Sequence, residues 1–417
     1  MDNKRLFSVI FVVFVDLLGF GLILPLLPYY AETFGASDFT TGLLVAAYAA
    51  MQLIGAPILG RLSDRFGRRP ILLVSIFGTF LGFILLGFAN SLWILFASRI
   101  LDGFTGGNLS VAQAYISDVT DEKNRSKGLG LVGAAFGIGF IIGPATGGFL
   151  SQWGYAVPAF LAAGLAFINL GLVAFWLPES LTPEKRATMT EKKPSVNLSA
   201  LWKALQRPFS GSLLITRFFF GLPFAIFQTI FSLYALKKFE LGAQETGLVL
   251  AYVGLLSVFV QAFLIGRLTQ RFREDILIPV AVVVMAFSLL GWAFAPTVVW
   301  LLIVLTPTAI AGGVLNTILA STLTKAVEPQ EVGGILGLST SIESLTRVIA
   351  PTLGGALLGW AGTAAPGIFS AAMLGLLSVY VWRVIYNHPI AAQIRAKTDT
   401  SPNLAPNKGK TGWKKTS

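Results

Sequence analysis

Twelve long apolar runs, separated by short polar joints, dominate the sequence and limit the folds open to it. Apolar runs of about 20 residues are long enough to cross the hydrocarbon core of a bilayer as helices. Lipid offers the backbone no hydrogen-bonding partners, so a spanning segment must pair its own N–H and C=O groups within a helix. The sequence therefore predicts an all-α, polytopic membrane protein with 12 transmembrane helices. The runs lie near residues 6–30, 40–59, 70–89, 91–115, 128–150, 156–177, 210–236, 243–266, 275–295, 298–323, 332–360 and 364–386.

The composition excludes most kinds of enzyme. Charged residues make up 12% of the 417 positions, about half of what a soluble domain carries. Cysteine is absent, which excludes disulfides and thiolate metal sites. The single histidine, His388, lies at the edge of a polar tail, so a histidine metal centre or a Ser-His-Asp triad lacks its usual residues. We expect no enzymatic activity, no cofactor and no bound metal.

The net charge of +11 reflects membrane topology rather than a nucleic-acid partner. Basic residues gather on the cytoplasmic side of membrane proteins. If the N-terminus is cytoplasmic, the inner joints contain the arginines of 61–69 and the basic linker 185–207, whereas the outer loops contain only Lys237 and Lys238. We expect a multi-pass protein of a plasma membrane, the bacterial inner membrane, with both termini in the cytoplasm.

Three motifs recur in the second part of the chain at an offset of 206 or 207 residues. The pairs are Gly60-Arg61-Leu62 with Gly266-Arg267-Leu268, Gly106-Gly107 with Gly312-Gly313, and Gly143-Pro144-x-x-Gly147-Gly148 with Ala350-Pro351-x-x-Gly354-Gly355. Three matches at nearly one offset indicate duplication, and tandem six-helix halves are a recurrent plan among transporters. The predicted parts are an N-terminal half 1–178, a linker 179–209, a C-terminal half 210–386 and a tail 387–417.

The linker and the tail are the two predicted segments outside the membrane. Within the linker, apolar residues recur at helical spacing at Leu198, Leu201, Trp202 and Leu205. This pattern fits either a short helix on the inner membrane surface or a loosely ordered connection. The tail is polar and rich in Pro, Asn and Lys, which predicts disorder.

Four segments resemble one family of membrane transporters. They are GRLSDRFGRRPIL at 60–72, Arg99-x-x-x-Gly103 followed by Gly106-Gly107, GFIIGPATGGFL at 139–150 and DLLGFGLILPLLP at 16–28. Together they resemble the major facilitator superfamily, and within it the twelve-helix drug:proton antiporters, similar to the tetracycline exporters. The resemblance implies export of an amphipathic small molecule in exchange for protons by alternating access. Tetracycline exporters carry a further acid in their third helix, where this chain has Gly82 and no acid.

The loop after the second helix is predicted to act as a conformational latch. Its glycines allow close helix approach, and its aspartate can face a helix N-terminus or pair with an arginine. Such a cluster can hold one state of a two-state machine, although the arginines would also serve simply to anchor the loop in the cytoplasm. The latch residues are Gly60, Asp64, Arg65, Gly67, Arg68, Arg69, Asp118 and Arg125.

The glycine–proline motifs of the fifth and eleventh helices are predicted to allow bending. Glycine lets neighbouring helices approach closely, and proline removes a backbone hydrogen bond. The same motifs would also appear if they served only tight packing. The residues are Gly139, Gly143, Pro144, Gly147 and Gly148 in the first half and Pro351, Gly354 and Gly355 in the second.

Charged residues within the apolar runs are functional candidates, because a charge in lipid is costly. The candidates for proton coupling are Asp16, Glu343 and Asp102, with Arg99, Arg217 and Arg347 as their charge partners. Asp16 has no arginine three or four residues later, which makes it the first choice. Glu343 with Arg347, and Arg99 with Asp102, have a spacing that also suits purely structural pairs.

The substrate is expected to bind between the halves, among apolar and aromatic side chains with a few polar groups. The candidate cavity residues are Gln52, Gln113, Phe220, Phe224, Gln228 and Gln261. The expected partners are a small molecule, protons and membrane lipid, and the expected state is a monomer. A sugar or organic-acid facilitator, a symporter, a lipid flippase and a membrane sensor remain alternatives. No phosphate-binding loop of the G-x-x-x-x-G-K-[ST] type is present, which disfavours an ATP-driven pump.

Overall fold

The computed structural model describes residues 3–181, 204–207, 209–328 and 331–386. Within these ranges, every regular element is a helix. The predicted surface helix around 198–205 lies almost wholly outside the described residues, and the predicted disordered tail 387–417 lies wholly outside them.

The helices follow the predicted apolar runs closely. Ten of them are long and apolar enough to cross a membrane within the described residues. The two remaining predicted spans correspond to the consecutive pair α5 and α6 and to the 30-residue helix α16. The first half contains α1 Asn3–Ile23, α2 Leu27–Glu32, α3 Asp38–Phe66, α4 Arg68–Gly87, α5 Leu92–Thr105, α6 Asn108–Val119, α7 Glu122–Leu150, η1 Ser151–Trp153 and α8 Ala156–Trp176. The second contains α11 Ser210–Phe239, α12 Ala243–Phe259, η2 Val260–Leu264, α13 Ile265–Arg271, α14 Glu274–Ala293, α15 Val298–Lys325, α16 Val332–Ala361, α17 Ala365–Val381 and η3 Trp382–Tyr386.

Two of the predicted spans are interrupted, and each interruption has a local cause. The first run breaks after Ile23, where Pro25 removes a backbone donor, and it resumes as the short helix α2. The fourth run breaks between α5 and α6 at Gly106-Gly107. A side chain at Gly107 would collide with the backbone of Ala56 in α3, so glycine lets the two helices touch there.

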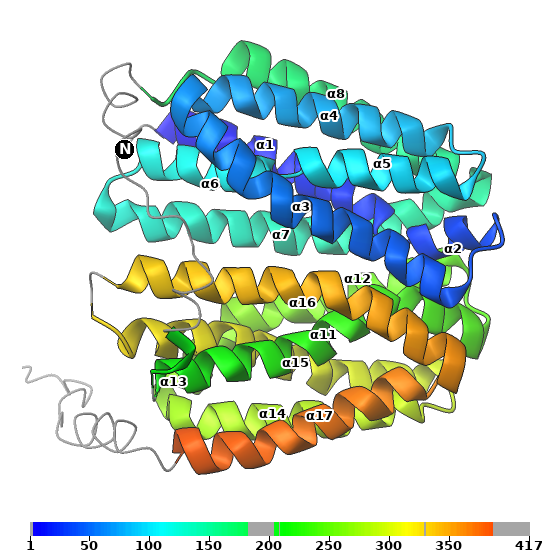
Figure 1. Ribbon diagram of the computed structural model, residues 1–417, viewed down its shortest axis with the longest axis vertical. Coiled ribbons are helices and arrows are strands. Elements are labelled where there is room, and N and C mark those ends of the chain that lie inside the picture. The colour runs from blue at the N-terminus through cyan, green and yellow to red at the C-terminus, as the bar shows by residue number, and fades with distance from the viewer. Residues whose placement is uncertain (1–2, 182–203, 208, 329–330, 387–417) are drawn as a thin grey trace, which may run out of the picture.

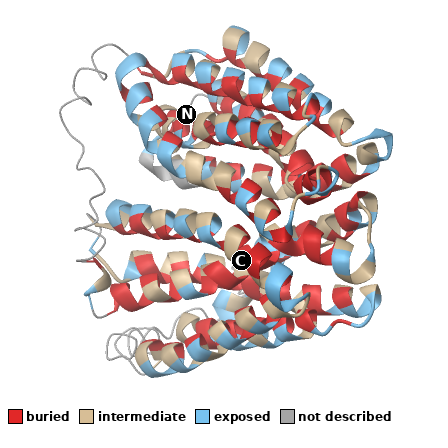
Figure 2. Ribbon diagram, turned by 45° about the vertical axis from the view of Figure 1, so that its right-hand side comes forward, coloured by how far each residue is buried: buried red, intermediate tan, exposed pale blue. Residues whose placement is uncertain are grey.

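The helices form two bundles with separate cores (Figure 1). Two buried apolar clusters lie within residues 6–177, and a third, larger cluster lies within residues 204–385. Figure 2 shows buried residues concentrated inside each bundle. We call the end of the molecule near α2 the α2 end, and the opposite end, where α3 gives way to α4, the linker end. The two halves can therefore be described as bodies that meet along an interface.

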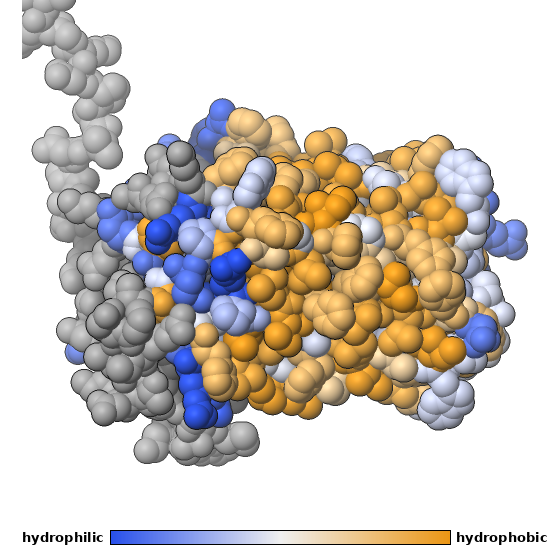
Figure 3. Space-filling model, turned by 90° about the horizontal axis from the view of Figure 1, so that it is seen from above, coloured by the Kyte–Doolittle hydropathy of each residue, from blue (hydrophilic) through white to orange (hydrophobic). Residues whose placement is uncertain are grey.

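The outer surface carries the band expected of a membrane protein. Figure 3 shows a broad hydrophobic belt over the exposed helices, with hydrophilic residues gathered mainly at the linker end. Large apolar side chains point outward along this belt, including Phe175, Trp176 and Phe287. In water such a surface would be unfavourable, whereas in a bilayer it faces hydrocarbon.

The halves touch through two equivalent pairs of helices at the α2 end. In one pair, α3 packs on α16, and a side chain at Gly42 would overlap the carbonyl of Pro351. In the other pair, α12 packs on α7, and a side chain at Gly247 would overlap the carbonyl of Pro144. The glycine–proline motifs of the two halves thus form matching contacts with the opposite half.

Polar contacts reinforce this closure at the α2 end. Lys237 Nζ lies 2.6 Å from Asp38 Oδ1 across the interface. The Tyr29 hydroxyl lies 2.5 Å from Thr246 Oγ1 and donates to the carbonyl of Leu241 at 3.1 Å. Lys237, one of the two lysines predicted in the outer loops, therefore joins the halves where they meet.

The same helices separate toward the linker end. A Cβ added at Gly130 or Gly133 of α7 would meet no atom within 4 Å, and the same is true at Gly333, Gly334 and Gly337 of α16. Glycines on the two crossing helices are thus tightly packed at the α2 end and open at the linker end. The structure is a conformation closed at the α2 end and open at the linker end.

We predict that Gly42→Ala and Gly247→Ala loosen the α2 end, because the added methyl group would overlap a proline carbonyl of the opposite half. The chain contains no native cysteine, so Ala243→Cys at this interface, where the residue is buried, can be labelled alone. The rate of maleimide labelling at position 243 should rise several-fold in both variants. Gly164→Ala serves as control, since a Cβ there meets nothing within 4 Å. Equal labelling rates in all variants would contradict the assigned packing.

Candidate functional site

A buried ion pair lies within the membrane-spanning part of the first half. Arg99 Nη1 lies 3.0 Å from Asp102 Oδ2 on α5, and both side chains are almost wholly buried. The Arg99 guanidinium also lies 5.7 Å from the centre of the Phe83 ring. Gly82 of α4 stands where the tetracycline exporters carry a further acid. A side chain at Gly82 would come within 2.9 Å of Asp102 Cβ, so Asp102 occupies the space beside this glycine. The pair satisfies two charges that would each be costly alone.

Asp16 lies close to this pair on α1 and is only partly buried. Its carboxyl group interacts with the Asn108 side chain at the start of α6 and is near enough to Asp102 to feel its charge. Asp16 forms no ion pair with any residue that the structure describes. Sequence reasoning missed Asn108, although its place directly after the Gly106-Gly107 break was a usable signal.

Two polar side chains of α3 complete the first-half site. Gln52 Nε2 donates to the Gly106 carbonyl at 3.0 Å and to the Tyr48 hydroxyl at 3.2 Å. The Tyr48 ring packs against Phe20 at 5.4 Å between centres. Gln52, a predicted cavity residue, therefore also holds the break between α5 and α6. Tyr48 was not predicted, because a lone tyrosine in an apolar run carries no distinctive pattern.

The second-half site is a carboxylate held between two arginines. Glu343 Oε2 lies 2.7 Å from Arg217 Nη2 of α11, and Glu343 Oε1 lies 2.8 Å from Arg347 Nη2 one turn along α16. Arg217 also donates to Asn316 Oδ1 of α15 at 2.7 Å. The spacing of Glu343 and Arg347 suggested their contact, whereas the contribution of Arg217 and Asn316 depends on how three helices pack.

The remaining predicted cavity residues are spread over several helices. Gln113, Gln228 and Gln261 are exposed. Phe220 is buried in the core of the second half and stacks on Phe224 at 5.7 Å between ring centres. Phe224 is partly buried and packs against Gly312. A role for these five residues in substrate binding stays a prediction.

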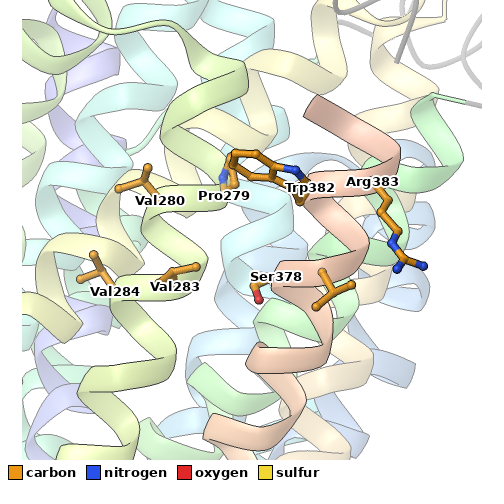
Figure 4. A pocket seen from close by; sticks show the side chains of 8 residues that line it. Pro279, Val280, Val283, Val284, Ser378, Trp382 and Arg383 are labelled. Atoms are coloured by element: carbon orange, nitrogen blue, oxygen red, sulfur yellow. The ribbon is translucent and has the colours of Figure 1, made fainter. Parts of the chain in front are cut away.

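A separate groove of about 430 Å³ lies on the second half between α14 and α17. Figure 4 shows Trp382, the first residue of η3 directly after α17, reaching toward Pro279 of α14 across this groove. Its other lining residues are mostly valines, with Arg383 as its one charged side chain. Among the described residues, the main packing partners of α14 and α17 belong to their own half, so we do not place the substrate there.

The predicted latch is a network centred on Arg68. Its guanidinium lies 2.6 Å from Asp64 Oδ1 and 3.1 Å from Asp118 Oδ2, which joins the end of α3 to α6. Two serines extend the network: Arg68 donates a hydrogen bond to Ser63 Oγ, and Ser180 Oγ donates one to Asp118 Oδ2. All of these residues belong to the first half or directly follow it.

Glu179 supports the network by capping α4. Its carboxylate accepts hydrogen bonds from the backbone N–H groups of Arg68 and Arg69, at 2.9 and 3.2 Å. A carboxylate at a helix N-terminus is favoured by the free N–H groups and by the helix dipole. The Arg69 side chain donates to the carbonyls of Val173 and Ala174 in α8.

The other predicted latch residues lie at the edge of the network. Arg65 is exposed and lies beside the Phe66 ring. Gly60 has open space around it, and Gly67 ends α3 with a φ of 107°, a backbone conformation that favours glycine. The side chain of Arg125 lies outside the described residues.

The second half contains the same contact with the charges exchanged. Glu274, at the start of α14, lies 206 residues after Arg68, and Lys325, at the end of α15, lies 207 residues after Asp118. Lys325 Nζ lies 2.7 Å from Glu274 Oε1, and Ser321 donates to the same carboxylate. The two halves thus contain an ion pair between helices at equivalent positions, with opposite polarity.

A further ion pair lies outside the membrane-spanning segments at the linker end. Arg207 Nη1 and Nη2 donate to both carboxylate oxygens of Glu331, at 2.8 and 2.7 Å. These hydrogen bonds lower the pKa of Glu331 from its ordinary value. The contact ties the segment before α11 to the start of α16.

Two pseudo-symmetric helical bundles, with charged groups set in their membrane-spanning helices, define a multi-pass membrane transporter. The profile described as "Major Facilitator Superfamily" matches residues 9–305 and 213–415. The chain belongs to this superfamily.

Similar proteins include bacterial tetracycline and multidrug resistance proteins. The class H tetracycline resistance protein of Pasteurella multocida is 34% identical over 359 residues, which cover 84% of this chain and 88% of that protein. Multidrug resistance protein 2 of Bacillus subtilis (strain 168) is 32% identical over 362 residues, which cover 85% and 89%. A solved structure of a bacterial homolog to the human lysosomal transporter Spinster aligns with a TM-score of 0.75 over 95% of this chain and 98% of that one. At 14% identity, that likeness shows the fold alone.

These matches confirm the resemblance seen in the sequence, the all-helical fold and the assignment to transporters rather than enzymes. They also confirm a multi-pass membrane protein. The roles of individual site residues stay predictions.

We predict that Arg68→Gln destabilises the protein, because it leaves two carboxylates, Asp64 and Asp118, without their shared cation. Breaking a buried ion pair on one side costs about 3 kcal/mol or more. The midpoint of thermal unfolding in detergent should fall by several degrees. Arg65→Gln is the matched control in the same loop, and it should leave the midpoint nearly unchanged. A similar fall in both variants would show that Arg68 acts only as a surface charge.

Proposed function

We propose that the protein is a secondary active transporter that exports amphipathic small molecules in exchange for protons by alternating access. The observation that carries this proposal is the partly buried Asp16 carboxyl group, which lies in the middle of α1 without an ion-pair partner among the described residues. A charged group without a partner inside a membrane is costly. A carboxyl group in that position gains from holding a proton, and it can release the proton when water reaches it.

The other carboxylates are less suited to carry the proton. Asp102 is paired with Arg99, and Glu343 is held by two arginines. An arginine stays charged and favours the ionised form of its partner. We therefore assign proton binding to Asp16 and assign Asp102 and Glu343 to fixed ion pairs that position the surrounding helices.

In the proposed cycle, the halves rock about the two helix contacts at the α2 end, α3 with α16 and α7 with α12. The present conformation, closed at the α2 end, receives substrate from the linker end. Rocking of the halves 1–178 and 210–386, joined by the linker 179–209, would break the contacts of Gly42 with Pro351 and of Gly247 with Pro144 and close the linker end. Substrate and proton would each shift the balance between the state open at the linker end and the state open at the α2 end. Because both act on the same two states, movement of one is coupled to opposite movement of the other.

We further propose that the linker end faces the cytoplasm of a bacterial cell. Arg61 and Arg65, their counterparts Arg267 and Arg271, and Arg68 lie at this end, in agreement with the positive-inside rule. The similarity to bacterial resistance proteins supports the plasma membrane as the location and efflux as the direction.

We predict that Asp16→Asn abolishes transport driven by a proton gradient, because an amide cannot load or release a proton. The purified chain would be reconstituted in liposomes, and uptake of fluorescent amphipathic compounds would be followed with and without an imposed pH gradient. Gradient-driven uptake in the variant should equal that of protein-free liposomes. Exchange of substrate across the membrane without a gradient should persist.

Asp102→Asn provides the comparison for this experiment. It removes the partner of the buried Arg99, so we expect a loss of thermal stability, unlike in Asp16→Asn. Gradient-driven uptake that survives in Asp16→Asn would move the proton site elsewhere. Movement of sugars or lipids, with no movement of amphipathic compounds under any gradient, would refute the export proposal and favour a facilitator or a flippase.

A further inference from the structure

The face of α16 that meets the first half carries a row of polar side chains. Pro351 and Gly355 of this face contact α3 at the α2 end. In an α-helix, residues four and eight positions apart share a face, so Arg347 lies on the same face as these two residues. On this face, Ser344 lies about one turn and Thr340 about two turns from Arg347 toward the linker end. Arg347 is therefore directed toward the interface between the halves, where they begin to separate.

Arg347 has unused hydrogen-bonding capacity at this position. Its side chain is 48% exposed, whereas that of Arg217 is 10% exposed. It donates from Nη2 to Glu343, and the structure gives its other N–H groups no acceptor among the described residues. A guanidinium group has five N–H donors in a planar arrangement that suits carboxylate and phosphate oxygens.

The carboxylate beside Arg347 is already shared. Glu343 contacts Arg217 through one oxygen and Arg347 through the other, so two positive charges face one negative charge and a net charge of +1 remains. The helix opposite, α3, has no acidic residue between Asp38 and Asp64. The carboxyl groups of Asp16 and Asp102 lie near the same Tyr48 side chain of α3 as Arg347, but neither forms an ion pair with Arg347 among the described residues. A positive charge in a partly dehydrated interface gains most from an anionic partner.

We propose that Arg347 binds an anionic group of the transported molecule, so that the substrates are amphipathic compounds that carry a carboxylate, sulfonate or phosphate group. This inference rests on the proposed function, because it assigns a substrate class to the same interface. Arg217 is a positioning residue: with Asn316, it holds Glu343 and thereby orients Arg347. Thr340 and Ser344 add hydroxyl groups on the same helix face toward the linker end, from which substrate would enter.

Binding to the purified full-length chain in detergent tests the substrate class without requiring transport. The probes are three dansyl compounds with the same ring system, carrying a carboxylate, no charge or a quaternary ammonium group. We expect the carboxylate compound to bind about tenfold more tightly than the other two, the effect of one charge-assisted hydrogen bond. In Arg347→Gln this preference should disappear while binding of the neutral compound stays the same. Arg347→Lys should keep a reduced preference, because it retains the charge but loses the planar donors.

Arg383→Gln is the matched control, because Arg383 is an exposed arginine of the same half in the groove between α14 and α17. It should leave the order of the three affinities unchanged. Tighter binding of the ammonium compound, or an unchanged preference in Arg347→Gln, would overturn the inference. The same compounds in liposomes separate this result from the proposed function: anion-selective binding without gradient-driven transport would support Arg347 as an anion site and refute proton-coupled export.

Discussion

The cost of placing charge in hydrocarbon governs the arrangement of this protein. An unpaired charged side chain within a bilayer costs several kcal/mol, and the chain places six candidate charges along its apolar runs. Five of the six are joined in two groups, Arg99 with Asp102 and Glu343 with Arg217 and Arg347. Asp16 is the exception among the described residues. The groups also fix the relative positions of helices, since Arg217 and Glu343 link α11 to α16 and Asn316 adds α15. Proton coupling and substrate selection would thus both arise from the charges that this arrangement leaves incompletely paired.

Close packing at the interface complements these charges. At the α2 end the halves meet where glycine of one half lies on a proline carbonyl of the other, and this happens twice in equivalent positions. Such contacts are short-ranged and lack a strong directional bond, so they can be broken and re-formed at low cost. The ion pairs on Arg68 and on Glu274 lie within their own halves. Ion pairs therefore hold each half together at the linker end, whereas glycine packing and the Lys237–Asp38 ion pair join the halves at the α2 end. This division suits movement of two rigid bodies.

Much of the fold could be predicted from the sequence, because lipid imposes a simple rule on long apolar runs. Span positions, the internal repeat and the family followed from hydropathy and from a few motifs at fixed spacing. The pairing of Glu343 with Arg347 followed from helix geometry. Arg217 and Asn316 could not be assigned to the same site, because their meeting depends on how α11, α15 and α16 pack. The ion pair of Glu274 with Lys325 could not be predicted from the repeat either. The equivalent positions of the first half carry Arg68 and Asp118, so the residue types do not match. The break after Ile23 was missed, although Pro25 and Pro28 marked it.

The central claim is that the two halves rock about the contacts at the α2 end. The absence of native cysteine allows spin labels to be attached only where cysteine is introduced. One pair, Asn90→Cys with Ala361→Cys, would report the separation of the halves at the α2 end, and a second pair, Arg65→Cys with Arg271→Cys, would report the linker end; all four residues are exposed. Distances in lipid nanodiscs would be measured at high and low pH, with and without substrate. The account predicts that the two distances change in opposite directions, one increasing as the other decreases. Distances that stay constant, or that increase and decrease together, would contradict alternating access by rigid halves.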